Sequence, residues 1–350
     1  MSSAFIPPNK EALLVKYSKL IPLYERLIVE ICFILEERLN KETIRIHGIH
    51  HRVKDFESFY QKLVANRIVD KPFESINDIA GIRIVCLYRK DLEEIGKIIF
   101  KHLEVTESDI KTKALKETEF GYLSDHYIVR LPKSCKGPRY DEIKPLKCEI
   151  QVRTILMDAW DSVSHHLDYK QEIDIPSSLR RDFYALSGLF YVADSHFQMF
   201  KDSVAELKSH LREDVEKDQF DLTQEMNLTT LQAYLEWKFP DREKSSQTEY
   251  SKLLLELKNT GYQQFKKLDE ALEKAFRVAE LYEKENPPIK RLGEGKSVEI
   301  RYSDVGFVRA CLELLDPTFG KYFRKSLPKK LADLVEKTLS KYRAMFEQGN

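Results

Sequence analysis

The sequence contains 350 residues, of which 42% are hydrophobic and 33% are charged. This share of apolar residues supplies a hydrophobic core and excludes a mainly disordered chain. At roughly 150 residues per domain, the length predicts two domains. The 57 Lys and Arg residues balance the 57 Asp and Glu residues, so binding to a polyanion must depend on local clusters of charge.

The sequence shows no feature of a membrane-spanning or secreted protein. It has no uncharged apolar stretch of about 18 residues, the length that a transmembrane helix needs. Its first residues, MSSAFIPPNKEALL, lack the basic region and apolar run of a secretory signal. The five cysteines are scattered and form no C-x-x-C pair, which argues against a disulfide framework. We therefore expect a cytoplasmic protein without membrane contact.

The residues up to about 175 predict an α/β domain. Hydrophobic residues three and four apart predict helices, and runs that are apolar or alternate in polarity predict strands. The predicted helices are 9–39, 55–66, 91–103 and 154–168, and the predicted strands are 44–49, 79–88, 122–131 and 147–153. The Lys- and Glu-rich stretch 106–120 is predicted to be a mobile loop.

The residues from about 177 onward predict a second, mainly helical region. The expected helices are 177–216, 229–238, 247–259, 265–284 and 329–347, with one short strand at 295–302. The predicted domains are therefore 1–175 and 176–350. The fold class is α/β, of the α+β type, with a sheet flanked by helices and a helical C-terminal region.

Two predicted strands each carry one polar face, because side chains alternate along a strand. One face of 147–153 carries Glu149, Gln151 and Arg153. One face of 122–131 carries Tyr122, Ser124 and His126. Either these faces line one cleft or they are solvated sheet surface.

Basic residues gather around the start of the predicted helix 55–66. Ser58 and Lys62 are four residues apart and share a helix face, and Arg52 and Lys54 precede the helix. Cations near a helix N-terminus fit a triphosphate. A solvated basic surface is the alternative.

The segment 77–86 places charged residues at a buried strand. Asp78 lies at the entry to the strand, and Arg83 lies within it, where an Arg needs a carboxylate or a ligand phosphate as partner. Asp78 and Glu149 could together hold Mg²⁺, which binds one or two carboxylates plus substrate phosphates. Since Asp78 and Arg83 differ in parity, Asp78 must lie in the preceding turn or at a bulge.

Taken in order, these motifs resemble the synthetase domain of the RelA/SpoT family. The motifs are R-x-K-x₃-S-x₃-K at 52–62, D-I-A-G-x-R at 78–83, G-Y-x-S-x-H at 121–126, E-I-Q-x-R-T at 149–154 and H-x₃-Y-K at 165–170. The resemblance covers about 40–175. It implies a nucleotidyltransferase-like mixed sheet and transfer of pyrophosphate from ATP to a ribose 3′-hydroxyl.

The resemblance also implies a role for each site residue. The implied metal ligands are Asp78 and Glu149, and Glu149 is also the implied base for the acceptor hydroxyl. The implied catalytic residues are Glu149, Asp78, Arg52 and Lys54. The implied ATP-binding residues are Arg52, Lys54, Ser58, Lys62 and Arg83. The implied acceptor-binding residues are Tyr122, which stacks on the base, and Ser124, His126, Gln151 and Arg153.

The identity of the acceptor is the open part of this interpretation. In the best-known members it is GDP or GTP, and the product is (p)ppGpp. Many members carry a Lys where this chain has Thr118, and EFGYLSDHY looks more like a divergent branch of stand-alone synthetases. Some members of that branch are toxins that modify the 3′ end of tRNA. GDP or GTP is the predicted acceptor, and tRNA is the alternative.

Three further expectations concern hydrolysis, the C-terminal region and partners. The chain has no His-Asp dipeptide, which the hydrolase half of the bifunctional relatives needs for its metal, so we expect no hydrolase activity. The tail 321–343 has eight Lys or Arg and two acidic residues. It is either a solvated face, an RNA contact or a brake, and with a tRNA acceptor the region would be an in-cis antitoxin or sensor. A catalytically silent nucleotide-binding module is a third interpretation, and the intact set of Asp78, Glu149, Arg52, Lys54 and Tyr122 argues against it. A homo-oligomer is left open.

Overall fold

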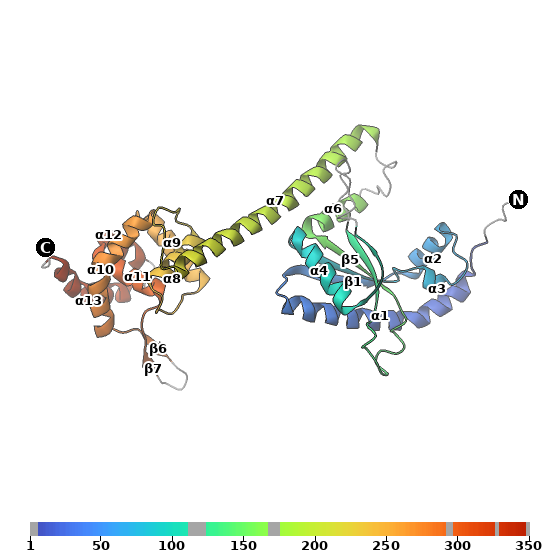
Figure 1. Ribbon diagram of the computed structural model, residues 1–350, viewed down its shortest axis with the longest axis horizontal. Helices are drawn as coiled ribbons and strands as arrows, with labels where there is room; N and C mark the ends of the chain where they lie inside the picture. Colours follow the sequence, from blue (N-terminus) through green and yellow to red (C-terminus); the bar gives the residue numbers. More distant parts are fainter. Residues whose placement is uncertain (1–5, 111–123, 167–175, 292–296, 326–328, 348–350) are drawn as a thin grey trace. The chain divides into compact units, whose positions relative to one another are not determined.

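The computed structural model describes residues 6–110, 124–166, 176–291, 297–325 and 329–347 (Figure 1). Its contacts divide the chain into two compact units, a first unit of Met1–Asp202 and a second unit of Ser203–Asn350. The division falls inside one long helix, α7 (Ser177–Glu216). The domain boundary predicted near 175 stays a prediction, and it lies beside residues that the structure does not describe.

The first unit alternates helices and strands before it enters α7. Its elements are α1 (Lys10–Lys41), β1 (Ile46–Val53), α2 (Phe56–Ala65), α3 (Pro72–Ser75), β2 (Ala80–Cys86), α4 (Arg89–His102), β3 (Glu104–Asp109), β4 (Asp125–Arg130), β5 (Cys148–Thr154) and α6 (Ile155–His166). These elements confirm the predicted helices and strands, with shifted ends. Within the described ranges, no helix combines the length and apolar character needed to cross a bilayer.

The five strands form one mixed sheet in the order β1-β2-β5-β4-β3. The central pair β2–β5 is parallel, and the other neighbours are antiparallel. This sheet with flanking helices confirms the predicted fold class. The parallel pair brings the chain segments around residues 81 and 149 side by side.

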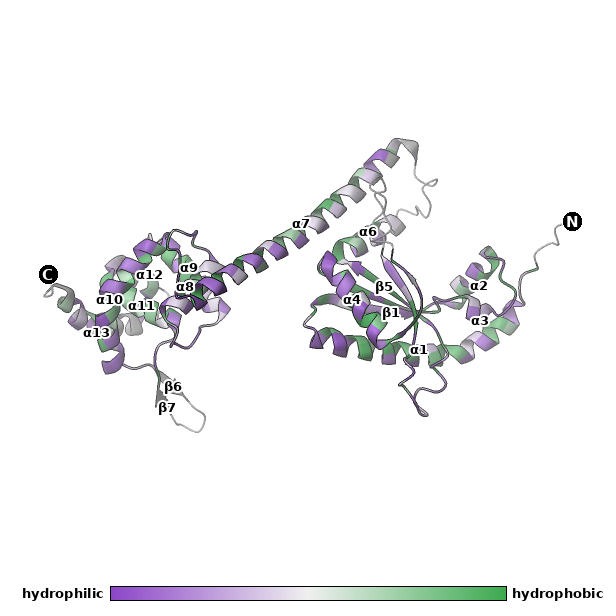
Figure 2. Cartoon of the chain, in the orientation of Figure 1, coloured by the Kyte–Doolittle hydropathy of each residue, from purple (hydrophilic) through white to green (hydrophobic). Residues whose placement is uncertain are grey.

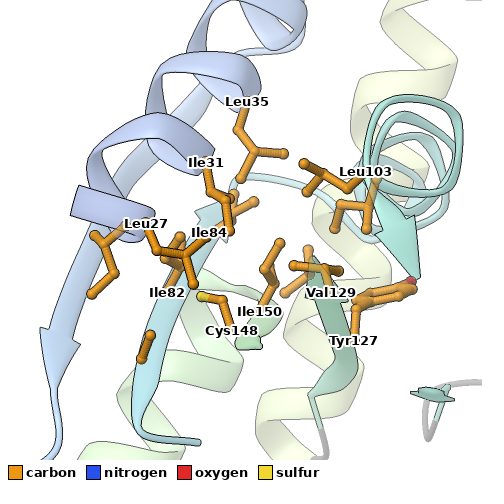
Figure 3. Close-up of a cluster of buried hydrophobic side chains, with 14 of the residues drawn as sticks. Leu27, Ile31, Leu35, Ile82, Ile84, Leu103, Tyr127, Val129, Cys148 and Ile150 are labelled. Atoms are coloured by element: carbon orange, nitrogen blue, oxygen red, sulfur yellow. The ribbon is translucent and has the colours of Figure 1, made fainter. Parts of the chain in front are cut away.

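One face of the sheet is covered by α1 and α4. Leu27, Ile31 and Leu35 of α1 pack on the apolar side chains of the central strands (Figure 3). Green hydrophobic and purple hydrophilic segments alternate along α1 (Figure 2), as expected for a helix with one buried face. Burial of these side chains stabilises the unit by about 25 cal/mol for each Å² of apolar surface removed from water.

The other face of the sheet is polar. Ile150 and Val152 of β5 are fully buried, whereas Glu149 and Gln151 are partly exposed. This alternation confirms the predicted parity of β5. In β4, Tyr127 and Val129 are buried in the core and His126 is partly exposed, which confirms the parity of β4 as well.

The prediction of a loop at 106–120 is wrong at its beginning. β3 continues to Asp109 and pairs antiparallel with β4. Its side chains from Thr106 to Asp109 are exposed. These residues form an edge strand, and the strand has too little apolar character to be told from a loop by its sequence. Residues 111–120 of the predicted loop lie outside the described residues.

The second unit is mainly helical. After α7 it contains α8 (Leu228–Lys238), α9 (Gln247–Asn259), α10 (Phe265–Glu285), β6 (Ile289–Arg291), β7 (Ser297–Glu299), α11 (Asp304–Leu315), α12 (Pro317–Arg324) and α13 (Lys329–Glu347). The helical prediction is confirmed, and the short strand predicted at 295–302 is β7, which pairs with β6. The sequence pattern did not predict β6, α11 or α12.

Three cysteines lie fully buried in the cores of the two units. Cys86 and Cys148 lie in the first unit and Cys311 lies in the second, and each is 0% exposed. Figure 3 shows Cys148 between the strands and α1. Burial raises the pKa of each of these thiols above its usual value. All five cysteines are free.

Candidate active site

The polar face of the sheet brings together residues from β1, β2, β5 and β4. Arg52 is paired with Gly81, and Gly81 with Glu149. Gln151 is paired with Arg83 on one side and with His126 on the other. Because paired residues point to the same face, segments that are far apart in sequence form one continuous polar surface.

Two clefts open on this surface. The arginine cleft, about 230 Å³ in volume, is lined by His50, His51, Arg52, Asp78, Gly81, Ile82, Arg83, Glu149 and Gln151. The histidine cleft, about 350 Å³ in volume, is lined by Lys62, Asn66, Ser75, Ile76, Asn77, Asp78, Glu107, Ser108, Asp109, His126, Ile128 and Glu149. Asp78 and Glu149 line both clefts, so the two carboxylates stand at their common border.

Asp78 lies in the turn before β2, the position that its parity requires. Its Oδ2 atom is 3.0 Å from Lys54 Nζ and 2.8 Å from Lys62 Nζ. Burial opposes ionisation, but the hydrogen bonds and charges of the two lysines outweigh it and hold the pKa of Asp78 below its usual value. Oδ1 is buried and has no hydrogen-bond partner among the described residues.

Glu149 is held by two neighbours on the sheet. His126 Nδ1 lies 3.1 Å from Oε1, and Gln151 Nε2 donates to Oε2 over 2.9 Å. Burial favours the protonated form, but these hydrogen bonds and the charge of His126 lower the pKa of Glu149 despite the nearby charge of Asp78. The carboxylate is therefore ionised and oriented at neutral pH, as a base or metal ligand requires.

The structure supplies the internal carboxylates that Arg83 needs. Arg83 NH1 is 3.0 Å from Asp158 Oδ1, and Arg83 NH2 is 3.7 Å from Asp161 Oδ2. Both aspartates lie on α6, one helical turn apart. Asp158 and Asp161 were not predicted as site residues, although their i, i+3 spacing soon after β5 places them on one helix face.

The predicted ATP-binding residues take different places. Arg52 and Arg83 line the arginine cleft, and Lys62 lines the histidine cleft. Lys54 contacts Asp78. The backbone N–H of Ser58 donates to Asp55 Oδ1 over 2.8 Å, and Asp55 is the N-cap of α2. Their roles toward ATP stay predictions.

The predicted acceptor-binding residues also lie in different places. His126 lines the histidine cleft, and Gln151 lines the arginine cleft. Ser124 hydrogen-bonds His126, with 2.8 Å between Oγ and Nε2. Arg153 is 3% exposed and lines neither cleft. Tyr122 lies outside the described residues, as does the end of the motif at 165–170.

The carboxylate pair fits the expected magnesium ion. Asp78 offers a buried oxygen without a hydrogen-bond partner among the described residues, and Glu149 faces the same clefts. The described residues contain no group of three or more His, Cys, Asp or Glu placed to hold a metal. Mg²⁺ is commonly held by one or two carboxylates together with substrate phosphates, so two carboxylates suffice.

Comparisons with known proteins identify the family. Residues 51–174 match the family described as "Region found in RelA / SpoT proteins". The GTP pyrophosphokinase YwaC of Bacillus subtilis is 34% identical over 150 residues, which cover 40% of this chain and 70% of that relative. The GTP pyrophosphokinase YjbM of the same organism is 30% identical over 136 residues, which cover 39% of this chain and 62% of the relative.

A solved structure is also similar to this chain. The small alarmone synthetase 1 of Bacillus subtilis aligns with a TM-score of 0.45 and 26% identity, over 55% of this chain and 98% of that chain. The matched segment 51–174 contains every site residue that the sequence predicted, from Arg52 to Arg153. Because the chain is 34% identical to a GTP pyrophosphokinase over 70% of that relative, and residues 51–174 match the family, it belongs to the RelA/SpoT family and is an enzyme of the pyrophosphotransferase class.

Proposed function

We propose that this enzyme transfers pyrophosphate from ATP to the 3′-hydroxyl of GDP or GTP and so makes the alarmone (p)ppGpp. The proposal includes Mg²⁺ bound by Asp78 and Glu149, and it includes no alarmone hydrolysis, because the chain lacks a His-Asp dipeptide. The names of the two curated relatives, both GTP pyrophosphokinases, support the guanine nucleotide.

The observation that carries the proposal is the meeting of two clefts at one carboxylate pair. A transfer between two nucleotides needs two binding spaces and a reaction centre where they meet. The arginine cleft offers Arg52 and Arg83 to a polyphosphate, for which guanidinium groups are suited. The histidine cleft offers the second space, with Lys62 and His126 beside the carboxylates.

The chemistry follows from this placement. The acceptor 3′-oxygen bonds to the β-phosphorus of ATP, the bond from that phosphorus to the α,β-bridging oxygen breaks, and AMP leaves with the bond's electron pair. Glu149 accepts the proton of the 3′-hydroxyl, and Arg52 and Arg83 stabilise negative charge on the phosphates. Bound Mg²⁺ supplies further electrostatic stabilisation of the phosphate oxygens.

The tRNA alternative has weaker support from the predicted contacts. In the loop 132–147, Lys144 Nζ donates to the carbonyl oxygens of Lys133 and Cys135, over 2.9 and 2.8 Å. Arg139 pairs with Glu30 at 2.7 Å. These two cations contribute to the packing of the loop, so fewer charges are available to RNA than the sequence suggested.

The basic tail gives a similar result. Arg324 pairs with Glu313 at 3.1 Å, and Lys341 pairs with Glu285 at 3.2 Å. Arg343 pairs with Glu336 at 2.7 Å. These contacts favour the interpretation of the tail as part of the folded second unit, whose role as brake, antitoxin or sensor stays a hypothesis.

The acceptor is tested with ATP labelled at its γ-phosphate. Purified protein is incubated with Mg²⁺, this ATP and either GDP, GTP or deacylated tRNA. We expect label in GDP and GTP products, none in tRNA, and one AMP for each labelled product. Release of ADP would contradict pyrophosphate transfer, and labelled tRNA without a labelled guanine nucleotide would contradict the choice of acceptor.

A charge variant separates the two acceptors further. Lys133 and Lys136 are exposed in the loop 132–147, and their joint replacement by Gln avoids the structural contacts of Lys144 and Arg139. With GDP or GTP, turnover should stay within about threefold, because exposed charges are screened beyond roughly 10 Å. With tRNA, each lost phosphate contact should flatten the salt dependence of binding by about one unit of slope.

A further inference from the structure

We propose that Arg153, anchored by Asp161, is a positioning residue that fixes the orientation of Gln151 and thereby of Glu149, and that it does not bind the acceptor. The catalytic consequence rests on the proposed function. The structural consequence, the orientation of one side-chain amide, does not depend on it.

The location of Arg153 excludes direct contact with a ligand in either cleft. Its side chain is 4% exposed, and it lines neither cleft. Its guanidinium contacts Asp161 Oδ2 at 2.5 Å, Gln151 Oε1 at 2.7 Å and Ser124 Oγ at 3.4 Å. A buried cation with these partners acts on the site through its neighbours.

The donor and acceptor pattern assigns the orientation of Gln151. A guanidinium only donates hydrogen bonds, whereas an amide has a carbonyl that accepts and an NH₂ group that donates. Because Arg153 occupies Gln151 Oε1, the NH₂ group is turned toward Glu149 and donates to it over 2.9 Å. A flipped amide would direct its carbonyl at the carboxylate, an arrangement with two acceptors and no donor.

A second route connects Arg153 to the other oxygen of Glu149. Ser124 Oγ is 3.4 Å from Arg153 NH2 and 2.8 Å from His126 Nε2. His126 Nδ1 in turn lies 3.1 Å from Glu149 Oε1. Arg153, Gln151, Glu149, His126 and Ser124 thus form a closed ring of hydrogen bonds, in which both carboxylate oxygens are oriented from a buried position.

Each of the two aspartates of α6 makes its closer contact with a different arginine. Asp161 lies 2.5 Å from Arg153 NH1, whereas Asp158 lies 3.6 Å away. Asp158 instead makes the closer contact to Arg83, at 3.0 Å against 3.7 Å for Asp161. Asp161 is therefore the anchor of Arg153, and Asp158 provides a matched comparison on the same helix face.

The experiment combines kinetics with a spectroscopic signature. The variants are Arg153→Met, Arg153→Lys, Asp161→Asn and Asp158→Asn, with Arg45→Met, at an exposed arginine, as control. For Arg153→Met and Asp161→Asn we expect kcat to fall about tenfold or more with both KM values within about threefold, since a displaced base affects the transition state. Asp158→Asn should mainly change KM for ATP, and Arg45→Met should change neither.

The spectroscopic signature is the pair of ¹H–¹⁵N resonances of the Gln151 side-chain NH₂ group. The pair is assigned by its disappearance in Gln151→Glu, which has no side-chain amide. We expect both resonances to shift in Arg153→Met, to shift less in Arg153→Lys, which keeps a cationic hydrogen-bond donor group, and to stay in place in Asp158→Asn. If Arg153→Met does not fold, as judged by circular dichroism, Asp161→Asn decides the question, because it retains the volume of the side chain and a hydrogen-bond acceptor.

Two results would overturn the proposal. One is an increase of the acceptor KM in the Arg153 or Asp161 variants with kcat unchanged, which would make Arg153 a binding residue. The other is an unchanged amide signature in folded Arg153→Met or Asp161→Asn protein. A wild-type protein that transfers label to no acceptor would contradict the proposed function, and the amide signature would still decide the orientation of Gln151.

Discussion

The two carboxylate oxygens of Asp78 have different surroundings. Lys54 and Lys62 form ion pairs with its Oδ2 atom, and its Oδ1 atom has no hydrogen-bond partner among the described residues. A buried oxygen without a partner costs about 1–3 kcal/mol. Retention of such a cost at the border of two clefts agrees with a functional role for this oxygen.

The first prediction at this scale concerns the carboxylate pair. We expect Glu149→Gln to keep the fold and to lower turnover at least about 10²-fold, because a metal ligand and a proton acceptor are both lost. Asp78→Asn should act similarly. Steady-state turnover at saturating Mg²⁺ and circular dichroism are the measurements.

The exposed Glu37 of α1 gives the matched control, and Glu37→Gln should behave as wild type. Turnover of Glu149→Gln near the wild-type value would remove this strand face from the reaction. Loss of the folded state in Glu149→Gln would be an equally unexpected result, since Gln keeps the shape of the side chain.

Strand parity alone predicted which side chains of β5 and β4 share the polar face, and the sheet register confirms it. Parity could not predict that Arg153 is buried under Asp161, because the alternation of side chains along a strand does not show where α6 packs on the sheet. The sequence left two partners open for Arg83, a carboxylate or a phosphate. The structure supplies the carboxylates, and the phosphate stays a prediction.

At the scale of elements, α4 approaches β4 unusually closely. A Cβ atom at Gly96 of α4 would lie 2.6 Å from the hydroxyl of Tyr127 in β4. Tyr127 is 2% exposed, so its ring has little freedom to move aside. The absence of a side chain at Gly96 is therefore a packing requirement, although Gly in a helix interior costs roughly 1 kcal/mol relative to Ala.

The second prediction follows from this contact. We expect Gly96→Ala to lower the free energy of unfolding by about 1–3 kcal/mol, because overpacking outweighs the gain in helix propensity. In a Tyr127→Phe background the hydroxyl is absent, so Gly96→Ala should be neutral or stabilising. Denaturant unfolding of the two single variants and the double variant measures the coupling.

Equal destabilisation by Gly96→Ala in both backgrounds would show that the hydroxyl is not the obstacle. In that case the ring itself, whose Cζ atom would lie 3.5 Å from the added Cβ, would set the distance between α4 and β4.

The predicted elements differ in how well they could be found. α1 and α10 have one apolar face and were predicted close to their observed limits. α11 was missed because its residues are buried on nearly all sides, so it lacks the 3.6-residue periodicity on which the prediction depends. β3 was missed for the opposite reason, since an exposed edge strand with polar side chains resembles a loop in sequence.

At the scale of the whole molecule, each unit has its own buried core, and the second unit contains a titratable group with an unusual environment. Burial raises the pKa of Glu313 in α11 to about 7, against the opposing effect of Arg324. The folded state therefore binds the Glu313 proton more tightly than the unfolded chain does. Stability from this group is present at acidic pH and is lost as the pH rises through about 7.

The third prediction is a pH dependence of the second unit. Between about pH 5 and 8, the free energy of unfolding should fall by up to about 3 kcal/mol, from a pKa difference of more than two units. Glu313→Gln should remove most of this decrease. Urea unfolding at several pH values, followed by the fluorescence of Trp237 in a Trp160→Phe background, measures it.

The control is Glu270→Gln, at an exposed position of α10, which should keep the wild-type pH dependence. The carboxyls of Glu249, Glu283 and Glu285 have lowered pKa values. Their contributions to the free energy of unfolding therefore change below about pH 4.5, outside the range from about pH 5 to 8. A profile for Glu313→Gln that matches wild type would assign the pH dependence to another group.

The buried thiols allow local unfolding of each unit to be measured without an added label. A thiol reagent reacts with the thiolate, and a buried cysteine with a raised pKa is inert until its surroundings open. Cys148 reports on the sheet one residue from Glu149, and Cys311 reports on α11. Peptide mapping after timed alkylation therefore gives two opening rates from one unlabelled sample. A bound nucleotide that stabilises the sheet should slow the modification of Cys148 by a factor that rises with the ratio of the free nucleotide concentration to its dissociation constant.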